Sequence, residues 1–259
     1  MNSDSMTDRK MRCASLSEEL RADFNIDNLS AIDVFALART IPKSSILLFP
    51  LGESISGLCI KQPDYSLIAI NSGQTYGRQR FTLSHELFHL HFDDQAGTII
   101  CPSNVSKASD VERDADSFAS FFLMPRLALK REIRDRGISP TRPLDDKLLR
   151  NIIEVEQKYG ISRSALLVRL EDERAISCQQ KDWLSRDVKK NAFRLGFPVA
   201  LYNRSQGEST KQATGYYVDL VGELLNNGAI SRGKAREYLS DGFRNDIHVV
   251  ELEGDDIFD

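Results

Sequence analysis

The sequence HELFH at positions 85–89 constrains this chain more than any other feature. It places His85 and His89 four residues apart, and residues at this spacing lie on one face of an α-helix. The apolar positions of residues 78–92 indicate such a helix, so both imidazoles can bind one metal ion. Glu86, one step along the helix, can then act on a metal-activated water without being a ligand itself.

The distribution of histidines supports a functional interpretation of this motif. The chain has only four histidines, and three of them lie between positions 85 and 91. A chance pentapeptide is therefore a weak alternative. We expect His91 not to be a ligand, because it points about 200° round the helix from His89. His248 is distant and alone, which is typical of a surface residue.

The third metal ligand has to come from elsewhere in the chain. A catalytic zinc site needs three protein donors and one open position. In the longer pattern HExxHxxGxxH a third histidine completes the set, but Phe92 and Gln95 occupy its glycine and third histidine positions here. The sequence therefore predicts a carboxylate ligand on a helix further along.

Residues 110–124 form that second predicted helix, with an apolar stripe that permits close packing on another helix. Glu112 and Asp116 lie one helical turn apart in it. We predict Glu112 as the third ligand and Asp116 as the acceptor of a histidine ring N–H, which would fix the tautomer of that ring. Taken alone, the segment also fits an ordinary amphipathic helix with solvated acidic side chains.

These segments, with GRQRFTLS at 77–84, resemble the ImmA/IrrE family of zinc endopeptidases over residues 45–175. The run ExxAxxFAxxxLMP, which begins at Glu112, is more specific than HExxH alone. The resemblance implies a cytoplasmic bacterial or phage-type peptidase with one Zn²⁺ per chain. Transferred to matching positions, it implies His85, His89 and Glu112 as ligands and Glu86 as general base.

The resemblance also implies a substrate and a biological role. Members of the family typically cut a helix-turn-helix (XRE-type) repressor at a limited site and so relieve repression. Stress, phage-defence or mobile-element regulation is the expected context, and a nucleic acid is a candidate activator. The alternatives are a non-catalytic zinc-containing DNA- or repressor-binding regulator and a toxin–antitoxin partner. Glu86 counts against a purely structural zinc site, because such a site has no use for a general base.

Cys101 lies between the two predicted metal-binding helices. A thiolate is a strong zinc ligand and could fill the open position as an inhibitory fourth ligand that holds the enzyme latent. The alternative is a small buried residue at a strand end, the commoner fate of a free cysteine. The reaction also needs a hydrogen-bond donor for the developing oxyanion, for which the candidates are Tyr76, Arg78, Arg80 and Tyr159.

The predicted fold class is α+β. A small N-terminal antiparallel sheet, with strands at 45–49, 57–61 and 65–71, is expected to pack on a mainly helical zincin-like domain. The predicted domain limits are a flexible leader at 1–15, a zinc metallopeptidase domain at 16–178, a C-terminal accessory or regulatory segment at 183–250 and an acidic tail at 251–259. Within the accessory segment, residues 198–203 are predicted as a short strand.

Residues 145–174 are predicted as helix, glycine turn and Ser-capped helix, which is similar to a helix-turn-helix motif. Arg163 and Arg169 on the second helix could contact DNA. Packing of its leucines on the peptidase core explains the pattern equally well, and the acidic residues at 171–173 would repel phosphates. We therefore favour a structural role for this segment.

Overall composition limits the partners. The chain has 34 Lys and Arg against 38 Asp and Glu, a formal net charge of −4 that gives no support to nucleic acid as the main partner. No apolar run approaches the roughly 20 residues that span a bilayer, so no membrane partner is expected. The four cysteines are scattered without a C-x-x-C pair, which favours reduced thiols and a cytoplasmic location.

Overall fold

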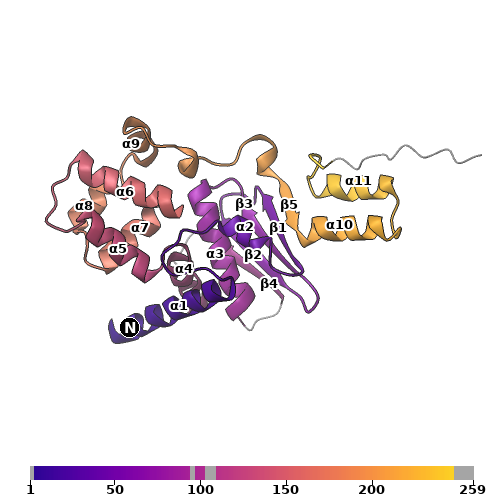
Figure 1. Cartoon of the computed structure of the whole chain (residues 1–259), viewed down its shortest axis with the longest axis horizontal. Helices are drawn as coiled ribbons and strands as arrows, with labels where there is room; N and C mark the ends of the chain where they lie inside the picture. The colour runs from indigo at the N-terminus through magenta and orange to yellow at the C-terminus, as the bar shows by residue number, and fades with distance from the viewer. Residues whose placement is uncertain (1–2, 94–96, 103–108, 248–259) are drawn as a thin grey trace, which may run out of the picture.

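The computed structural model describes residues 3–93, 97–102 and 109–247. Figure 1 shows a central sheet with a group of helices at one end of the molecule and a helical pair at the other. The fold is mixed α+β, which confirms the predicted class. None of the described helices combines the length and apolarity needed to cross a membrane.

The described part of the sheet has five strands in the order β4-β2-β3-β1-β5. Strands β1 and β3 run parallel, and the other neighbouring pairs are antiparallel. The edges are therefore β4 and β5. The strands are β1 (Ser44–Phe49), β2 (Ile55–Lys61), β3 (Ser66–Asn71), β4 (Gly97–Pro102) and β5 (Gln212–Gly215).

The prediction of an antiparallel sheet is wrong for one pair of strands. Strand β3 lies between β2 and β1 and runs parallel to β1. The β2–β3 hairpin reverses the chain, so β3 runs in the direction of β1 when it pairs with that strand. Three consecutive residues of β3, Ile68, Ala69 and Ile70, are buried. A strand that is buried on both faces belongs inside a sheet.

Helices stack on this sheet in layers. Helix α3 (Tyr76–Phe92) packs on β2 and β3, α4 (Asp110–Leu123) packs on α3, and α1 (Ser3–Asp23) packs on α4. The short helix α2 (Val34–Ala38) also contacts α3. Buried side chains from these layers form one apolar cluster. Helix α3 is thus enclosed between the sheet and α4.

The flexible leader predicted at residues 1–15 is wrong over the described residues, which form the first half of α1. Cys13 has an exposed fraction of 0%. Arg9 and Arg12 both pair with Asp114 of α4. The N-terminal part of this helix is attached to α4 through ion pairs. Ion pairs do not require apolar residues at helical spacing, so the sequence shows no periodicity from which this part of the helix could be predicted.

A second group of helices follows α4. A separate apolar cluster holds them together, and Leu184 and Ala192 share it with Ile152. The predicted domain boundary lies between residues 178 and 183, and buried side chains from both sides of it belong to this one cluster. The domain limits themselves stay predictions. The helices are α5 (Arg126–Arg136), α6 (Asp146–Tyr159), α7 (Arg163–Asp172), α8 (Cys178–Leu184) and α9 (Val188–Arg194).

The C-terminal segment returns to the sheet. It begins with 3₁₀ turns at Ala200–Tyr202 and Gly207–Thr210, so the strand predicted at 198–203 is wrong. Strand β5 then pairs with β1. Helices α10 (Tyr216–Asn226) and α11 (Arg232–Asp241) form a pair beyond that edge, with a small apolar core of their own (Figure 1). The predicted acidic tail lies outside the described residues.

Candidate metal centre

His85 and His89 lie on α3 and direct their Nε2 atoms to a common position. These two atoms are 3.2 Å apart. Glu112 of α4 brings Oε2 to 3.3 Å from Nε2 of His85 and Oε1 to 3.4 Å from Nε2 of His89. Two donors bound to a tetrahedral metal ion at the usual zinc distances would lie roughly 3.3 Å apart. The spacing of the three side chains therefore fits a metal ion.

The other ring nitrogen of each histidine faces a carboxylate. Nδ1 of His85 lies 2.8 Å from Asp116 Oδ1, and Nδ1 of His89 lies 3.1 Å from Asp93 Oδ2. In each pair the ring Nδ1–H donates a hydrogen bond to the carboxylate, so the neutral imidazole carries its lone pair on Nε2. Two lone pairs and the Glu112 carboxylate then converge on one point, an arrangement that needs a cation.

The pKa values of the same groups without a metal ion show this demand for positive charge. Burial disfavours the charged form of His85, but hydrogen bonds to Asp116 and Glu112 outweigh it and raise the pKa of His85 to about 9. Hydrogen bonds from His85 and His89 lower the pKa of Glu112 to about 2. A metal ion would supply the positive charge that otherwise comes from a proton.

Glu86 follows His85 on α3 and has an exposed fraction of 0%. By distance and angle, neither of its carboxylate oxygens has a hydrogen-bond partner within the described part of the chain, although the Cys101 thiol lies close enough to influence the pKa of Glu86. Gly57 of β2 leaves room for it, because a Cβ at that position would lie 2.6 Å from Glu86 Oε1. Burial raises the pKa of Glu86. A buried carboxylate without a partner opposes folding, so its presence calls for a functional explanation.

Cys101 of β4 is the fourth side chain at this position, with an exposed fraction of 1%. One ligand atom from each of His85, His89, Cys101 and Glu112 lies within 4.8 Å of the others. The burial of Cys101 agrees with the alternative of a small buried residue at a strand end, and its role as an inhibitory fourth ligand stays a prediction. Cys101 is buried near the end of β4, and it lies beside the three candidate metal ligands.

The first turn of α4 is fixed so that Glu112 faces α3. The Ser109 hydroxyl accepts a hydrogen bond from the Glu112 amide at 3.2 Å. The spacing S-x-x-E is typical of a capping box, in which the glutamate would reach back to the serine amide. Here the Glu112 carboxylate lies at the two histidines instead. Two residues further on, Asp114 pairs with Arg9 and Arg12 of α1.

Two buried arginines hold the last turn of α4. Arg21 of α1 donates to the Phe122 carbonyl at 2.7 Å. Arg169 of α7 donates to the carbonyls of Ser120 at 2.8 Å and Met124 at 3.0 Å. Carbonyls at a helix C-terminus lack partners within the helix, and positive charge is favourable there. The helix that carries the third ligand is thus anchored at both ends.

Burial of the arginines on α7 decides between the two interpretations of residues 145–174. Arg163 and Arg169 each have an exposed fraction of 4%. Arg163 pairs with Glu156 and donates to the Leu184 carbonyl at 2.6 Å. Neither guanidinium can reach a DNA phosphate from these positions, so the structure supports the packing role for both.

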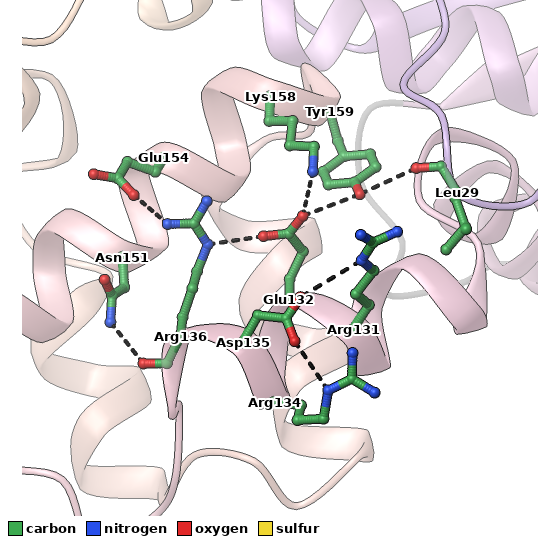
Figure 2. Close-up of polar contacts among 10 residues, drawn as sticks. All are labelled: Leu29, Arg131, Glu132, Arg134, Asp135, Arg136, Asn151, Glu154, Lys158 and Tyr159. Carbon is green, nitrogen blue, oxygen red and sulfur yellow. Dashed lines mark hydrogen bonds and ion pairs between the residues drawn. The ribbon is translucent and has the colours of Figure 1, made fainter.

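Tyr159, one of the candidate oxyanion donors, belongs to a different polar network. Figure 2 shows its hydroxyl between Glu132 Oε1 and the Leu29 carbonyl, 3.2 Å from each. Glu132 also pairs with Lys158 and Arg136. This network ties α5 to α6 and to the loop that contains Leu29. It removes Tyr159 from the candidates.

Two of the other candidate donors are also engaged away from the metal centre. Arg80 donates to two backbone carbonyls, and the ring of Tyr76 stacks on Phe35. Arg78 differs, because it lines a cavity of about 250 Å³ together with Asp116. Of the four candidate oxyanion donors, Arg78 is therefore the one that shares a cavity with a residue of the site.

The structure brings together the six residues that the sequence placed at the site. They are His85, Glu86, His89, Cys101, Glu112 and Asp116. The histidine expected to be a bystander, His91, contacts the ring of Phe24 edge-on. The other, His248, lies outside the described residues.

The sequence interpretation missed Asp93 and Gly57. Asp93 follows His89 by four residues, the same spacing that pairs the two histidines, so a search for a carboxylate near each histidine would have found it. No local pattern marks Gly57. Its importance depends on the packing of β2 over α3, which brings it against Glu86.

Residues 45–171 match the family model of the IrrE N-terminal-like domain, Peptidase_M78. The matched range contains both metal-binding helices and β4, and so all six site residues. No curated protein sequence matches the chain. Through residues 45–171 the chain therefore belongs to the Peptidase_M78 family, the metallopeptidases of the ImmA/IrrE type.

Proposed function

We propose that this protein is a zinc-dependent endopeptidase that makes a limited cut in a helix-turn-helix repressor and so relieves repression. One observation carries the proposal. His85, His89 and Glu112 converge beside Glu86, whose buried oxygens have no partner among the described residues. The family match supports metallopeptidase chemistry. The repressor substrate rests on the resemblance to ImmA/IrrE proteins, and a cytoplasmic location is part of the same proposal.

Zinc suits this set of donors. Two imidazoles and one carboxylate are a common catalytic zinc set, and they leave a fourth position open. Asp116 and Asp93 would hold the two imidazoles in the tautomer that binds metal. When bound, zinc would polarise the scissile carbonyl and activate water for attack.

Glu86 would act as the general base. Its carboxylate lies among buried groups, so the proton it takes from the attacking water is shielded from bulk solvent. The protonated Glu86 then delivers this proton to the nitrogen of the leaving amine. Burial raises the pKa of Glu86, which favours retention of the proton between the two steps.

A non-catalytic DNA- or repressor-binding regulator is the second candidate, and two observations count against it. The arginines of the helix-turn-helix-like segment, Arg163 and Arg169, are buried and bound within the protein. A purely structural metal site also gives no reason to bury Glu86 without a partner. No observation favours a toxin–antitoxin partner.

The test is cleavage of the helix-turn-helix protein encoded next to this gene. Purified protein is incubated with it, with zinc or a chelator and with or without single-stranded DNA as a candidate activator. We expect one discrete cut that depends on zinc. Glu86→Gln should reduce the rate by about 10²–10⁴-fold, and the matched control Glu19→Gln, which alters an exposed glutamate of α1, should not.

Two results would overturn the proposal in different ways. An intact substrate in every arm, with one zinc bound per chain, would favour the binding regulator. Cleavage that Glu86→Gln leaves unchanged would remove Glu86 from the mechanism.

A further inference from the structure

Cys101 is directed inward by the alternation of β4. Successive side chains of a strand point to opposite faces of the sheet. Ile100 has an exposed fraction of 57%, whereas that of Cys101 is 1%. The thiol therefore lies on the face of β4 that is turned toward the ligands on α3 and α4.

A β-bulge adjoins this position. In the pairing of β2 with β4, Ile55 is opposite Pro102 and Gly57 is opposite Cys101, so Ser56 is an extra residue on β2. The Ser56 hydroxyl donates to the Cys101 carbonyl at 3.1 Å. Bulges bend a strand locally and re-aim side chains, and they are frequent beside functional sites. The bulge thus fixes the backbone at Cys101.

The residue opposite Cys101 is Gly57, whose missing side chain leaves space for the Glu86 carboxylate. The thiol is consequently close to both acidic groups of the site. A thiol placed among carboxylates is unfavourable as a thiolate unless a cation is bound beside it.

The distances place the sulfur near a fourth coordination position. A thiolate bound to zinc at about 2.3 Å would lie roughly 3.6 Å from the other donors of a tetrahedral site. The ligand atoms of all four residues lie within 4.8 Å of one another without a metal ion. A small shift of the Cys101 side chain or of β4 would complete the tetrahedron.

We infer that Cys101 is the fourth ligand of the metal centre in its resting state and closes the position that the attacking water needs. On binding, the sulfur releases its proton to solvent, the water leaves, and no electron is transferred. This inference rests on the proposed function. It adds that the peptidase is latent as folded, because Glu86 has no water to activate while the thiolate is bound.

The position of β4 provides a route to the active form. It is an edge strand of the described sheet, in which its only pairing partner is β2. Displacing its end would withdraw Cys101, whereas the other three ligands stay fixed on packed helices. Activation is then an exchange of thiolate for water that leaves the His85, His89 and Glu112 set intact.

The direct test is absorption spectroscopy of the full chain loaded with Co²⁺ in place of zinc. A thiolate ligand gives Co²⁺ a strong near-ultraviolet charge-transfer band, which nitrogen and oxygen ligands do not give. We expect this band in the wild-type protein and its loss in Cys101→Ser. The matched control is Cys59→Ser, which alters another fully buried cysteine and should retain the band. With the repressor substrate, Cys101→Ser should be at least about 10-fold more active than wild type if about nine-tenths of the resting sites are closed.

X-ray absorption of the zinc-loaded wild-type protein tests the inference without a variant that could misfold. We expect one sulfur neighbour at about 2.3 Å beside nitrogen and oxygen neighbours. One metal bound per chain with only nitrogen and oxygen neighbours would overturn the latch and leave the proposed peptidase standing. Failure of the protein to bind Co²⁺ or zinc would overturn both. These two failures are distinguished by the metal content.

Discussion

Among the residues that the structure describes, two glutamates have an exposed fraction of 0%, and their surroundings are opposite in kind. Glu156 of α6 is bound by the Arg163 guanidinium through both oxygens and accepts a hydrogen bond from the Tyr202 hydroxyl at 2.7 Å. Glu86 of α3 has no hydrogen-bond partner among the described residues. Burial raises the pKa of both carboxyls. Burial and a raised pKa therefore do not by themselves distinguish a functional carboxylate from a structural one.

The surroundings of the two glutamates explain the difference. The Glu156 network joins α6, α7 and the turn at Ala200–Tyr202, and its charges are compensated within the protein. At the metal centre, lone pairs of His85 and His89 and the carboxylate of Glu112 face one another. Within the described protein, the negative charge and lone pairs of that region have no compensating positive group, and a bound cation would supply one. Such local inconsistency is expected where function, rather than stability, selects the residues.

The largest effect on stability should come from removing the partner of Glu156, which would leave it a buried carboxylate without a charge partner, as Glu86 is. Arg163→Met removes the charge partner of Glu156 and the donor to the Leu184 carbonyl. Breaking a buried ion pair in this way typically destabilises a protein by about 3–5 kcal/mol. The measurement is the free energy of unfolding from urea denaturation monitored by circular dichroism.

The control for this prediction is the double variant Glu156→Gln with Arg163→Met. Because it removes both charges, it should recover much of the lost stability. A single variant as stable as wild type would show that water reaches Glu156. The contrast with Glu86 would then fail.

The two regions also differ in how far the sequence predicted them. The helices of the metal centre were predicted at 78–92 and 110–124 and are observed as Tyr76–Phe92 and Asp110–Leu123. Metal ligands and apolar stripes both follow the helical repeat, so local spacing contains the information. The Glu156 network was not predicted, because the sequence favours packing of the helix that contains Arg163 but does not indicate which side chain this arginine pairs with.

The errors in the predicted fold have the same origin. The central position of β3 and the attachment of α1 by Arg9 and Arg12 depend on contacts between segments that are distant in the chain. The space that Gly57 gives to Glu86 is another such contact. Periodicity reports which face of an element is apolar. It does not report which partner covers that face.

The next largest effect should come from Gly57→Ala, which reduces the space around Glu86 without touching a ligand. The new Cβ would lie 2.6 Å from Glu86 Oε1 and 2.7 Å from Thr82 Cγ2, so the carboxylate has to move. Displacement of a catalytic group by about 1 Å can reduce turnover by about 10²-fold. We expect that loss in the repressor cleavage assay, with the bound zinc retained.

The matched control is Gly222→Ala in α10, where a Cβ would meet nothing within 4 Å. It should leave cleavage unchanged. Full activity of Gly57→Ala would show that Glu86 can move without loss of function, and that its position does not depend on the space left by Gly57.

A smaller effect should follow from Asp116→Asn, which weakens the hydrogen bond that orients His85. Partners of this kind typically contribute about 10–100-fold to metal affinity. Asp93→Asn should act similarly through His89. Zinc affinity measured by competition with a chelating dye checks both variants. Asp110→Asn, on the same helix as Asp116 but exposed, is the control; equal affinities for all three would contradict an orienting role.

The smallest expected effect, and the sharpest test of the comparison, is the stability of Glu86→Gln in the metal-free protein. An unpartnered buried carboxylate opposes folding, and a neutral amide of nearly the same shape opposes it less. We expect the variant to gain about 1 kcal/mol in free energy of unfolding while it loses cleavage activity. Glu156→Gln, which removes one side of a compensated pair, should instead lose stability. If Glu86→Gln is destabilised to the same degree, then Glu86 has partners in solution, and the absence of a partner cannot be the feature that separates the two glutamates.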